Sequence, residues 1–404
     1  MTITVIGVDG AALPPGGEAL LDKATLVVGG RRHLELHVRN GATTIELGAL
    51  DKALEALAAH TAEHGPAVVL ASGDPGYFGV LRALRDKGIR PQVVPAPSSV
   101  QRLAALVGRP WDDVTVVSAH GRGLRQALNV CRARPAVAVL TAPGAGPAEL
   151  AAGLTGWRRT FVVAEDIGGD EIVSTVDATD AVRRTWREPN VVLCLADPDA
   201  VAPRGWLAGG EPLPGTSGWA LPEDDFAHRD GMVTKAEVRA LALAKLAPAP
   251  GTLIWDVGAG SGSVAVECAR FGAAVVAVER DPVQCVRIIA NVTTHGVDVR
   301  VVEAEFLAAV HGMPEPDAIF VGGGASVTGV LENCWQALTV SGRIVVHGVT
   351  LETEELLSGW HERLGGELIR MSFERAEPLG SFRGWTPTRA ITQWSMTKPP
   401  RSDE

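Results

Sequence analysis

The fold of this 404-residue chain is decided by the stretch Asp256-Val257-Gly258-Ala259-Gly260-Ser261-Gly262. The stretch contains the end of the apolar run 253–257, which is typical of a buried parallel strand, and leads into a helical pattern that begins at Val264. Glycines let the backbone turn sharply and approach a ligand, and the N–H groups at the start of the helix attract an anionic group. The stretch therefore predicts an α/β fold with an anion-binding turn at the carboxyl edge of a parallel sheet.

The glycine spacing narrows the choice of ligand for this turn. A dinucleotide fingerprint reads G-x-G-x-x-G, whereas the turn reads D-x-G-x-G-x-G, the spacing associated with S-adenosylmethionine. Glu279 ends the next strand about 20 residues further on, where an acid can accept both ribose hydroxyls of a nucleoside. A tight strand-to-helix connection explains the glycines equally well on their own, but the strand, helix and distal acid in register favour the binding site.

The α/β pattern around this turn extends over residues 226–404. Glu305 follows its third strand and Gly322-Gly323-Gly324 follows its fourth, at the edge where open parallel sheets bind ligands, although ordinary turns explain the triple glycine equally well. The last two predicted strands, 367–373 and 389–396, have no helix between them, so we expect an antiparallel hairpin at the sheet edge. This order is typical of a methyltransferase rather than a dehydrogenase. The earlier strands are predicted at 253–257, 274–279, 299–302, 318–321 and 344–347.

Residues 1–196 form another α/β region, and a chain of this length is expected to contain two domains. Its continuous apolar strands alternate with helical patterns, which predicts parallel sheets covered on both faces. Residues 197–225 contain five prolines and five glycines and lack a periodic apolar pattern, so they predict an interdomain linker. The strands of the N-terminal region are predicted at 26–28, 67–70, 114–117, 137–140, 160–163 and 191–193.

Composition excludes several classes of protein. Hydrophobic residues make up 46% of the chain, which indicates a globular protein, and 47 acidic against 37 basic residues give a net charge of −10, which disfavours a nucleic-acid partner. The N-terminus lacks the basic segment of a signal peptide, and no apolar run approaches the roughly 18 residues of a membrane span, so we expect a cytoplasmic protein without a membrane partner. No zinc spacing occurs, so no metal is predicted. The cysteines lack a C-x-x-C pair and are expected to be buried free thiols; they are Cys131, Cys194, Cys268, Cys285 and Cys334.

Four stretches of the C-terminal region resemble the precorrin decarboxylating methyltransferase family. They are GMVTKAEVR at 231–239, WDVGAGSGSV at 255–264, VERDP at 278–282 and VTLET at 349–353. One position departs from the family pattern, because His347 stands where many relatives carry asparagine, and a lone histidine at a strand end is more often structural than catalytic. The resemblance implies an S-adenosylmethionine pocket lined by Thr234, Asp256, Gly258, Ala259, Gly260, Ser261, Gly262, Glu279, Ala304 and Glu305.

Four stretches of the N-terminal region resemble the tetrapyrrole methylase family, whose members bind S-adenosylmethionine between two α/β lobes. They are GDPGYF at 73–78, PAPSSV at 95–100, SAHGR at 118–122 and TAPGAGP at 141–147, and any one alone fits an ordinary turn. The stretches 28–34 and 111–113 resemble the precorrin carbon-5 methylases within that family. Residues 7–10 depart from the family's G-x-G-P-G, which leaves the contacts of this loop open. The resemblance implies cofactor contacts from Gly73, Asp74, Pro75, Ser98, Ser99 and Thr141.

The two resemblances together match the precorrin-6Y C(5,15)-methyltransferase (decarboxylating) family. This implies a two-lobed tetrapyrrole methylase fold followed by a Rossmann-like class I methyltransferase, each with one S-adenosylmethionine site, in a homo-oligomer. The N-terminal domain would methylate carbon 5 of the tetrapyrrole, and the C-terminal domain would methylate carbon 15 and decarboxylate the ring C acetate, giving precorrin-8X. A polycarboxylate substrate needs local cations, although each candidate fits a solvated surface residue equally well. The candidates are Arg31, Arg32, His120, Arg122 and Arg125, with Arg375, Arg383 and Arg389 in the C-terminal domain.

No catalytic residue is predicted, because methyl transfer depends chiefly on holding the two reactants together in a dry pocket. Two alternatives remain open. One is a nucleic-acid methyltransferase built on the C-terminal domain, which the acidic composition opposes. The other is a chain whose C-terminal domain alone is catalytic, with the N-terminal domain as a substrate-binding module.

Overall fold

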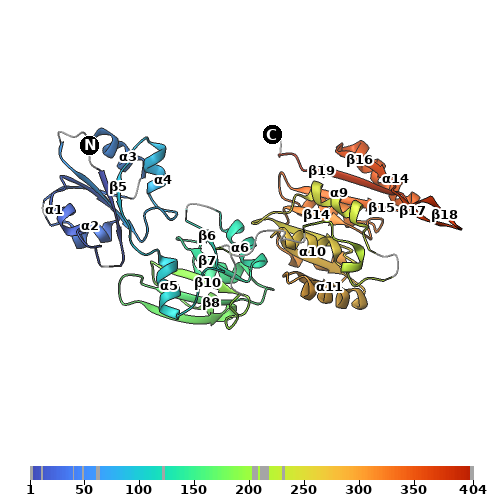
Figure 1. Cartoon of the computed structure of the whole chain (residues 1–404), viewed down its shortest axis with the longest axis horizontal. Coiled ribbons are helices and arrows are strands. Elements are labelled where there is room, and N and C mark those ends of the chain that lie inside the picture. Colours follow the sequence, from blue (N-terminus) through green and yellow to red (C-terminus); the bar gives the residue numbers. More distant parts are fainter. Residues whose placement is uncertain are drawn as a thin grey trace. The chain divides into compact units, whose positions relative to one another are not determined.

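The computed structural model describes residues 3–10, 12–39, 41–47, 50–60, 64–120, 123–202, 208–209, 218–229 and 233–400 (Figure 1). Their contacts divide the chain into two compact units. The N-terminal unit contains the residues up to 122 together with 136–153 and 159–204, and the C-terminal unit contains 123–135, 154–158 and the residues from 205 onward. The predicted linker thus lies where the chain passes into the C-terminal unit, but two short segments of the N-terminal region also group with that unit.

The first sheet of the N-terminal unit is entirely parallel, as the sequence predicted. Its strand order is β3-β2-β4-β1-β5, and the apolar side chains of β1 and β4 are buried on both faces of the sheet. The strands are β1 (Ile3–Val8), β2 (Leu26–Gly29), β3 (Thr43–Glu46), β4 (Ala67–Ser72) and β5 (Gln92–Val94). The helices between them are α1 (Gly17–Asp22), α2 (Arg31–His37), α3 (Leu50–Ala59) and α4 (Leu81–Asp86).

The second sheet of this region is mostly antiparallel, so the prediction of parallel sheets was wrong here. Only β6 and β7 run parallel in the order β6-β7-β10-β8-β9. The reason is local, because the turn 166–171 joins β8 directly to β9 without a crossover helix. The strands are β6 (Thr115–Ser118), β7 (Ala136–Leu140), β8 (Thr160–Glu165), β9 (Ile172–Asp177) and β10 (Val191–Leu195), and the helices are α5 (Ser99–Val107), α6 (Leu124–Ala133), α7 (Pro147–Gly153) and α8 (Ala178–Arg183).

The C-terminal unit contains a seven-stranded sheet in the order β13-β12-β11-β14-β15-β19-β16. The first five of these strands are parallel, and β19 is antiparallel to both of its neighbours. The strands are β11 (Leu253–Val257), β12 (Ala274–Glu279), β13 (Arg300–Glu303), β14 (Ala318–Val321), β15 (Arg343–Gly348), β16 (Glu367–Met371) and β19 (Ile391–Thr397). The helices are α9 (Ala236–Leu246), α10 (Ser263–Arg270), α11 (Pro282–Thr294), α12 (Phe306–Ala309), α13 (Val330–Ala337) and α14 (Leu351–Leu364), with 3-10 turns at Glu223–Asp225 and Val310–Gly312.

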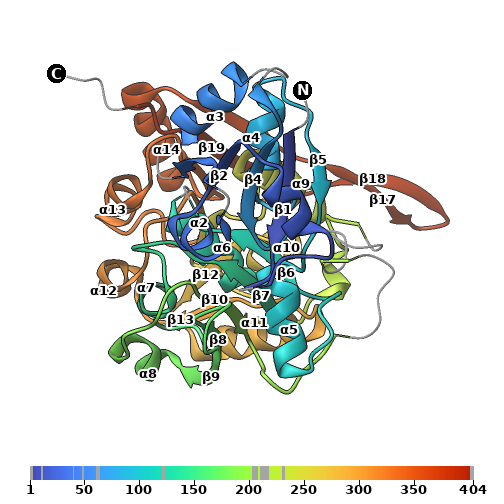
Figure 2. The same ribbon diagram turned by 90° about the vertical axis from the view of Figure 1, so that its left-hand side faces the viewer.

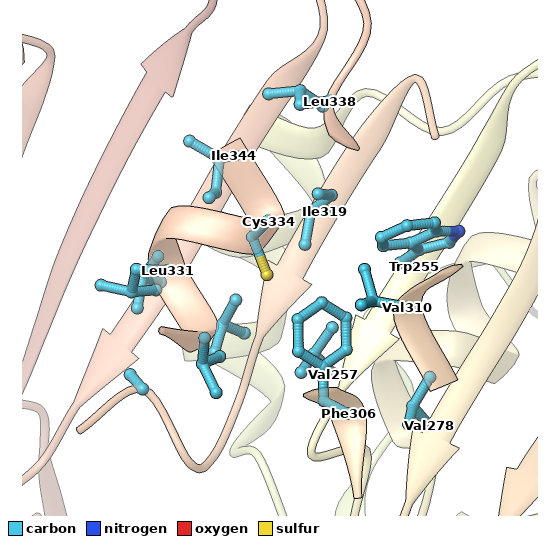
Figure 3. Close-up of a cluster of buried hydrophobic side chains, with 14 of the residues drawn as sticks. Trp255, Val257, Val278, Phe306, Val310, Ile319, Leu331, Cys334, Leu338 and Ile344 are labelled. Carbon is cyan, nitrogen blue, oxygen red and sulfur yellow. The ribbon is translucent and has the colours of Figure 1, made fainter. Parts of the chain in front are cut away.

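Helices cover both faces of this sheet, which explains its uninterrupted apolar strands. Alternate strand residues such as Trp255 and Ile319 pack against α12, α13 and α14 (Figure 3), and the residues between them, such as Phe320, pack against α9, α10 and α11. Each large apolar side chain buried in this way contributes about 1.5–3 kcal/mol. The predicted Rossmann-like architecture is confirmed.

The two terminal strands pair at the sheet edge as predicted, but they are not a simple hairpin. Between β16 and β19 the chain forms a separate antiparallel pair, β17 (Glu374–Leu379) and β18 (Phe382–Pro387), which projects away from the sheet (Figures 1 and 2). Three large apolar side chains of this hairpin are exposed: Leu379 by 68%, Phe382 by 78% and Trp385 by 71%. The sequence pattern missed the hairpin because proline and glycine interrupt its alternation.

Candidate functional site

The glycine turn after β11 has the backbone that its sequence requires. Gly258, Gly260 and Gly262 all have left-handed φ angles, of 66°, 57° and 76°. A Cβ on Gly258 would lie 2.5 Å from the carbonyl oxygen of Gly323, so the turn and the loop after β14 meet backbone to backbone. A Cβ on Gly260 would meet no atom within 4 Å, so open space lies beside this residue. Gly258 is therefore a packing requirement, whereas Gly260 leaves room for a ligand.

Asp256 lies buried behind the turn. Its Oδ2 accepts a hydrogen bond of 3.0 Å from the N–H of Ala265 in the first turn of α10, while Oδ1 has no partner among the described residues. Burial, reinforced by the nearby charge of Glu279 and only partly offset by the Ala265 bond, raises the pKa of Asp256 to about 7. The side chain is not part of the cavity wall, so its position suits holding the helix against the turn.

Glu279 is oriented by three backbone N–H groups. Its Oε2 accepts from Gly260 at 2.8 Å, and its Oε1 accepts from Arg280 and Asp281 at 2.9 Å each. A carboxylate has about four acceptor positions, so these bonds fix its direction and leave capacity for a hydroxyl. The structure thus places the predicted ribose acceptor directly beside Gly260.

A cavity of about 880 Å³ opens beside this turn. Two of the residues predicted to contact the cofactor, Asp256 and Gly262, lie outside its wall, and a Cβ on Gly262 would contact Ile288 instead. The other residues predicted for the C-terminal cofactor pocket all line this cavity: Thr234, Gly258, Ala259, Gly260, Ser261, Glu279, Ala304 and Glu305.

Four cations line the same cavity, and three of them were not predicted. Arg389 was a candidate from the sequence, whereas Arg229 precedes the stretch 231–239, Lys235 lies within it and Arg280 directly follows Glu279. Arg280 also pairs with Glu305 at 3.2 Å on the exposed rim. The available signal was that these three cations lie in or beside stretches that resemble the family. Basic residues are too common on surfaces for the sequence to single these out.

The cavity wall at Thr234 is held by a buried ion pair. Arg239 donates from Nε to Glu267 Oε1 at 3.0 Å, from Nη1 to the carbonyl of Thr234 at 2.5 Å and from Nη2 to the carbonyl of Leu221. Glu267 also accepts from the backbone N–H groups of Ala220 and Leu221. Both charged side chains are completely buried, so this pair fixes the segments on either side of residue 226 against α9 and α10.

Two predicted substrate-binding arginines of the C-terminal domain lie elsewhere. Arg375 on β17 donates to both carboxylate oxygens of Glu237 at 2.7 and 2.8 Å, which ties the hairpin to α9. Arg383 lies on the exposed strand β18. Neither residue lines the cavity. Arg125 donates to the carboxylate of Asp317 and, at 2.8 Å, to the carbonyl of Glu315.

In the N-terminal unit, the ends of β1, β4 and β5 converge. A Cβ on Gly7 would lie 2.6 Å from the carbonyl oxygen of Gly73 and 2.7 Å from the backbone nitrogen of Ala96, so the two predicted loops meet at this glycine. Gly73 has a φ of 65°, and Asp74 Oδ1 accepts from the N–H of Gly76 at 2.7 Å within the same turn, which also contains the buried Pro75. The structure therefore brings the G-D-P turn next to the loop before Ser98.

Two of the three predicted hydroxyl groups of this unit, those of Ser98 and Thr141, already have protein partners. Ser98 caps α5, because its Oγ accepts from the N–H of Gln101 while the Gln101 side chain accepts from the N–H of Ser98, and Ser99 is the first residue of that helix. Thr141 donates to Asn190, with distances of 2.5 Å to its carbonyl and 2.8 Å to its side-chain oxygen. Ser98 and Thr141 therefore help to shape the loops, although each hydroxyl keeps part of its hydrogen-bonding capacity for a ligand.

The loop that departs from the family pattern is tied to the turn between β8 and β9. Arg102 donates to Asp9 Oδ1 and to Glu171 Oε1, and Glu171 also accepts from the N–H of Gly168 at 3.0 Å. Burial opposes ionisation of Glu171, but these hydrogen bonds and the charge of Arg102 outweigh it and lower the pKa of Glu171. A Cβ on Gly10 would lie 2.6 Å from the Cα of Gly168, so the two backbones touch.

The remaining predicted cations of this unit are dispersed. Arg31 pairs with Glu35 on the surface of α2, Arg32 donates to the carbonyl of Ile167 at 3.0 Å, and His120 is exposed. Arg122 lies outside the described residues.

Three further features concern the cysteines, metal binding and membrane-spanning helices. All five cysteines are free and buried, as predicted. Among the described residues, no group of three or more His, Cys, Asp or Glu side chains is arranged to hold a metal ion. Within the same residues, no helix has the length and apolar character needed to cross a bilayer.

The C-terminal cavity fits S-adenosylmethionine. Gly260 borders open space, and Glu279 is bonded to its N–H. At the start of α10, Ala265 is bonded to Asp256, whereas Ser263 and Val264 line the cavity and can offer their N–H groups to the donor's carboxylate. The volume of about 880 Å³ is near the upper end of the usual range of roughly 300–1,000 Å³ for small-molecule sites, which leaves space for part of a second ligand.

Comparison with known proteins gives the same division of the chain. Residues 3–180 match the tetrapyrrole (corrin/porphyrin) methylases, and residues 224–398 match the precorrin methyltransferase domain. A precorrin-6Y C(5,15)-methyltransferase (decarboxylating) from Sinorhizobium is 39% identical over 98% of this chain and 96% of its own length, and one from Mycobacterium tuberculosis is 34% identical over 97% and 98%. The solved C-terminal domain of the Rhodobacter capsulatus precorrin-6Y C5,15-methyltransferase is 41% identical, covers 44% of this chain and 97% of that domain, and gives a TM-score of 0.42. The chain belongs to the precorrin-6Y C(5,15)-methyltransferase (decarboxylating) family.

Proposed function

We propose that this chain methylates precorrin-6Y at carbons 5 and 15 and decarboxylates the ring C acetate, giving precorrin-8X, a step of cobalamin biosynthesis. The observation that carries the proposal is the C-terminal cavity, which is lined by the glycine turn, by Glu279 and by several cations. The relatives named above, which match nearly the whole chain, support the same reaction.

Each unit would bind one molecule of S-adenosylmethionine, which supplies an electrophilic methyl group. In the C-terminal unit, Glu279 would accept the ribose hydroxyls, Gly260 would let the backbone approach the donor, and Thr234, Ala304 and Glu305 would complete the wall. In the N-terminal unit, the Gly73–Pro75 turn and the loop before Ser98 would offer backbone groups. These residues would orient the two reactants and exclude water, which can supply most of the rate.

The cations of the cavity would bind the substrate's carboxylates. Arg229 and Lys235 precede α9 and Arg389 precedes β19, so cations from two separate segments line the cavity and can hold a polyanion at several points. Arg375, another candidate from the sequence, does not line this cavity, and its guanidinium donates to Glu237.

We assign carbon-5 methylation to residues 1–196 and carbon-15 methylation with decarboxylation to residues 226–404. The competing hypothesis, an N-terminal binding module, draws support from the occupied hydroxyls of Ser98 and Thr141. Calorimetry on the full chain distinguishes the two, because Gly260→Val should leave one donor site if both units bind S-adenosylmethionine and none if only the C-terminal unit does.

We further propose a cytoplasmic homo-oligomer without nucleic-acid or membrane partners. The exposed Leu379, Phe382 and Trp385 of the hairpin support self-association, because an isolated two-stranded hairpin is marginally stable in water. Sedimentation of a variant with serine at all three positions tests this point. A molecular mass equal to that of the wild-type oligomer would show that the hairpin does not form the interface.

The reaction itself is tested by incubating the purified chain with precorrin-6Y and S-adenosylmethionine and weighing the product by mass spectrometry. Gain of two methyl groups with loss of carbon dioxide is the expected result. Gain of a single methyl group would restrict activity to one unit, and an unchanged substrate would overturn the proposal.

A further inference from the structure

The part of the cavity formed by β14, β15, β16 and β19 is lined by apolar side chains, one histidine and, just before β19, Thr388 and Arg389. Phe320, Met371 and Ile391 line it together with His347, the next-to-last residue of β15. The imidazole stands edge-on to the Phe320 ring, with 4.8 Å between centroids, and its Nε2 lies 2.9 Å from Gln393 Oε1. Gln393 is the partner of His347 in the β15–β19 register, so the two strands hold this pair together.

The His347–Gln393 pair is unfavourable as simple packing. His347 is 8% exposed and Gln393 is completely buried, and polar groups in such positions destabilise the fold unless they are hydrogen-bonded. The two side chains share one bond, and the Nε2 of Gln393 has no partner among the described residues. Turning the amide over would leave its oxygen unpartnered instead. Gln393 does not line the cavity, so His347 is the member of the pair that can contact a ligand.

The imidazole is uncharged at neutral pH. Burial lowers the pKa of His347 to about 4, the bond to Gln393 opposes this only partly, and no charged side chain contributes. With the amide turned over, its NH2 group donates to Nε2 of His347 and the ring proton lies on Nδ1, so in this orientation the pair presents a neutral N–H to an acceptor. Among the cations that line the cavity, Arg389 is the nearest to this wall in the sequence, two residues before Ile391, and the others lie before α9 and after β12.

We propose that His347, held by Gln393, is the subsite for the substrate acetate that leaves as carbon dioxide. This inference rests on the proposed function and extends it to one side chain. A neutral N–H orients the carboxylate without stabilising its charge as strongly as an arginine would. The surrounding apolar wall then favours conversion of the charged group into neutral carbon dioxide.

The chemical step balances without a further reactant. The bond between the methylene carbon and the carboxyl carbon breaks, and its electron pair moves into the conjugated macrocycle. Carbon dioxide leaves, and a proton from water is finally bound by the methylene carbon, which becomes a methyl group. His347 acts in this step by positioning the acetate.

The test compares three variants with the wild-type chain. His347→Phe keeps an aromatic ring but removes the hydrogen bond, His347→Asn keeps a neutral donor, and Gln393→Met removes the residue that orients the ring. The readouts are carbon dioxide release from precorrin-6Y, the affinity for S-adenosylmethionine by calorimetry and the melting temperature.

We expect kcat/KM for carbon dioxide release to fall at least tenfold in His347→Phe, and by a smaller factor in Gln393→Met, with donor affinity and melting temperature unchanged. His347→Asn should stay within threefold of the wild type. The inference is overturned if His347→Phe releases carbon dioxide at a rate within threefold of the wild type, or if it weakens donor and substrate equally, as a structural role would. A wild-type chain without any activity would instead reject the proposed function.

Discussion

Both units use an arginine to connect loops that are distant in the sequence, but the surroundings of the two arginines differ. In the C-terminal unit, Arg239 and Glu267 are completely buried, and Nε, Nη1 and Nη2 of Arg239 each donate to an oxygen atom. In the N-terminal unit, Arg102 is 30% exposed, with Asp9 at 32% and Glu171 at 14%. The same chemistry therefore holds one binding loop rigidly and the other loosely.

The difference follows from the cost of removing charge from water. A buried pair attracts strongly but leaves a severe penalty when one partner is lost, whereas a partly exposed pair is screened by water and salt. We infer that the C-terminal cavity is pre-formed and that the loops of the N-terminal unit separate more readily. The predictions below test this contrast in order of decreasing effect.

The largest effect is expected from Arg239→Met. This change leaves Glu267 buried without its partner and should lower the free energy of unfolding by about 3–5 kcal/mol. Urea denaturation followed by tryptophan fluorescence measures it, with Arg102→Met as the matched variant. Similar losses from the two variants would remove the contrast between the units.

The second effect concerns the glycine turn. Gly260 and Gly296 have similar φ angles, 57° and 60°, and a Cβ on either would meet no protein atom within 4 Å, so valine should strain both equally. Only Gly260 borders the cavity. We expect Gly260→Val to reduce carbon-15 methylation at least about 100-fold, or roughly 2.7 kcal/mol, and Gly296→Val to leave it within threefold. Equal losses would show that backbone strain, and not a blocked donor site, is responsible.

The third effect is acid sensitivity in the N-terminal unit. Burial, aided by Arg32 and His37, lowers the pKa of His33 to about 4, and its Nε2 lies 2.8 Å from Ser72 Oγ. The unfolded chain binds this proton near pH 6.5, whereas the folded chain binds it only near pH 4. The free energy of unfolding is therefore at its full value above pH 6.5 and decreases as the pH falls toward 4. At pH 5 the loss should be about 1–2 kcal/mol. His33→Asn should flatten the dependence of unfolding free energy on pH, and an unchanged slope would contradict this account.

The smallest effect is expected at Arg102. Its removal by Arg102→Met should cost about 1 kcal/mol or less, and 1 M salt should reduce that difference further because exposed pairs are screened. Hydrogen exchange of the amide of Gly168, which bonds to Glu171, reports whether the loop opens. Protection that is independent of both the substitution and salt would mean that the Gly10–Gly168 contact alone holds the loop.

The sequence correctly predicted those features of the fold and site that depend on residues close together in the chain. The glycine turn, its strand and helix, and Glu279 were all located from local spacing, because left-handed backbone and a strand-end acid leave local signals. The antiparallel second sheet was not predicted, since the position of β10 between β7 and β8 depends on long-range pairing. Arg375 was assigned to substrate because nothing in its surroundings reveals Glu237, which lies 138 residues earlier. Charge pairing of this kind becomes visible only in the fold.

The position of β19 has a consequence for how the C-terminal unit is made. This strand is synthesised after every other strand of its sheet, yet it lies between β15 and β16. On the ribosome, β16 is made before the strand that separates it from β15, so β16 cannot take its place in the sheet until β19 has been made. His347 therefore meets Gln393 only after β19 has been synthesised, and the cavity wall at His347 forms later than the glycine turn.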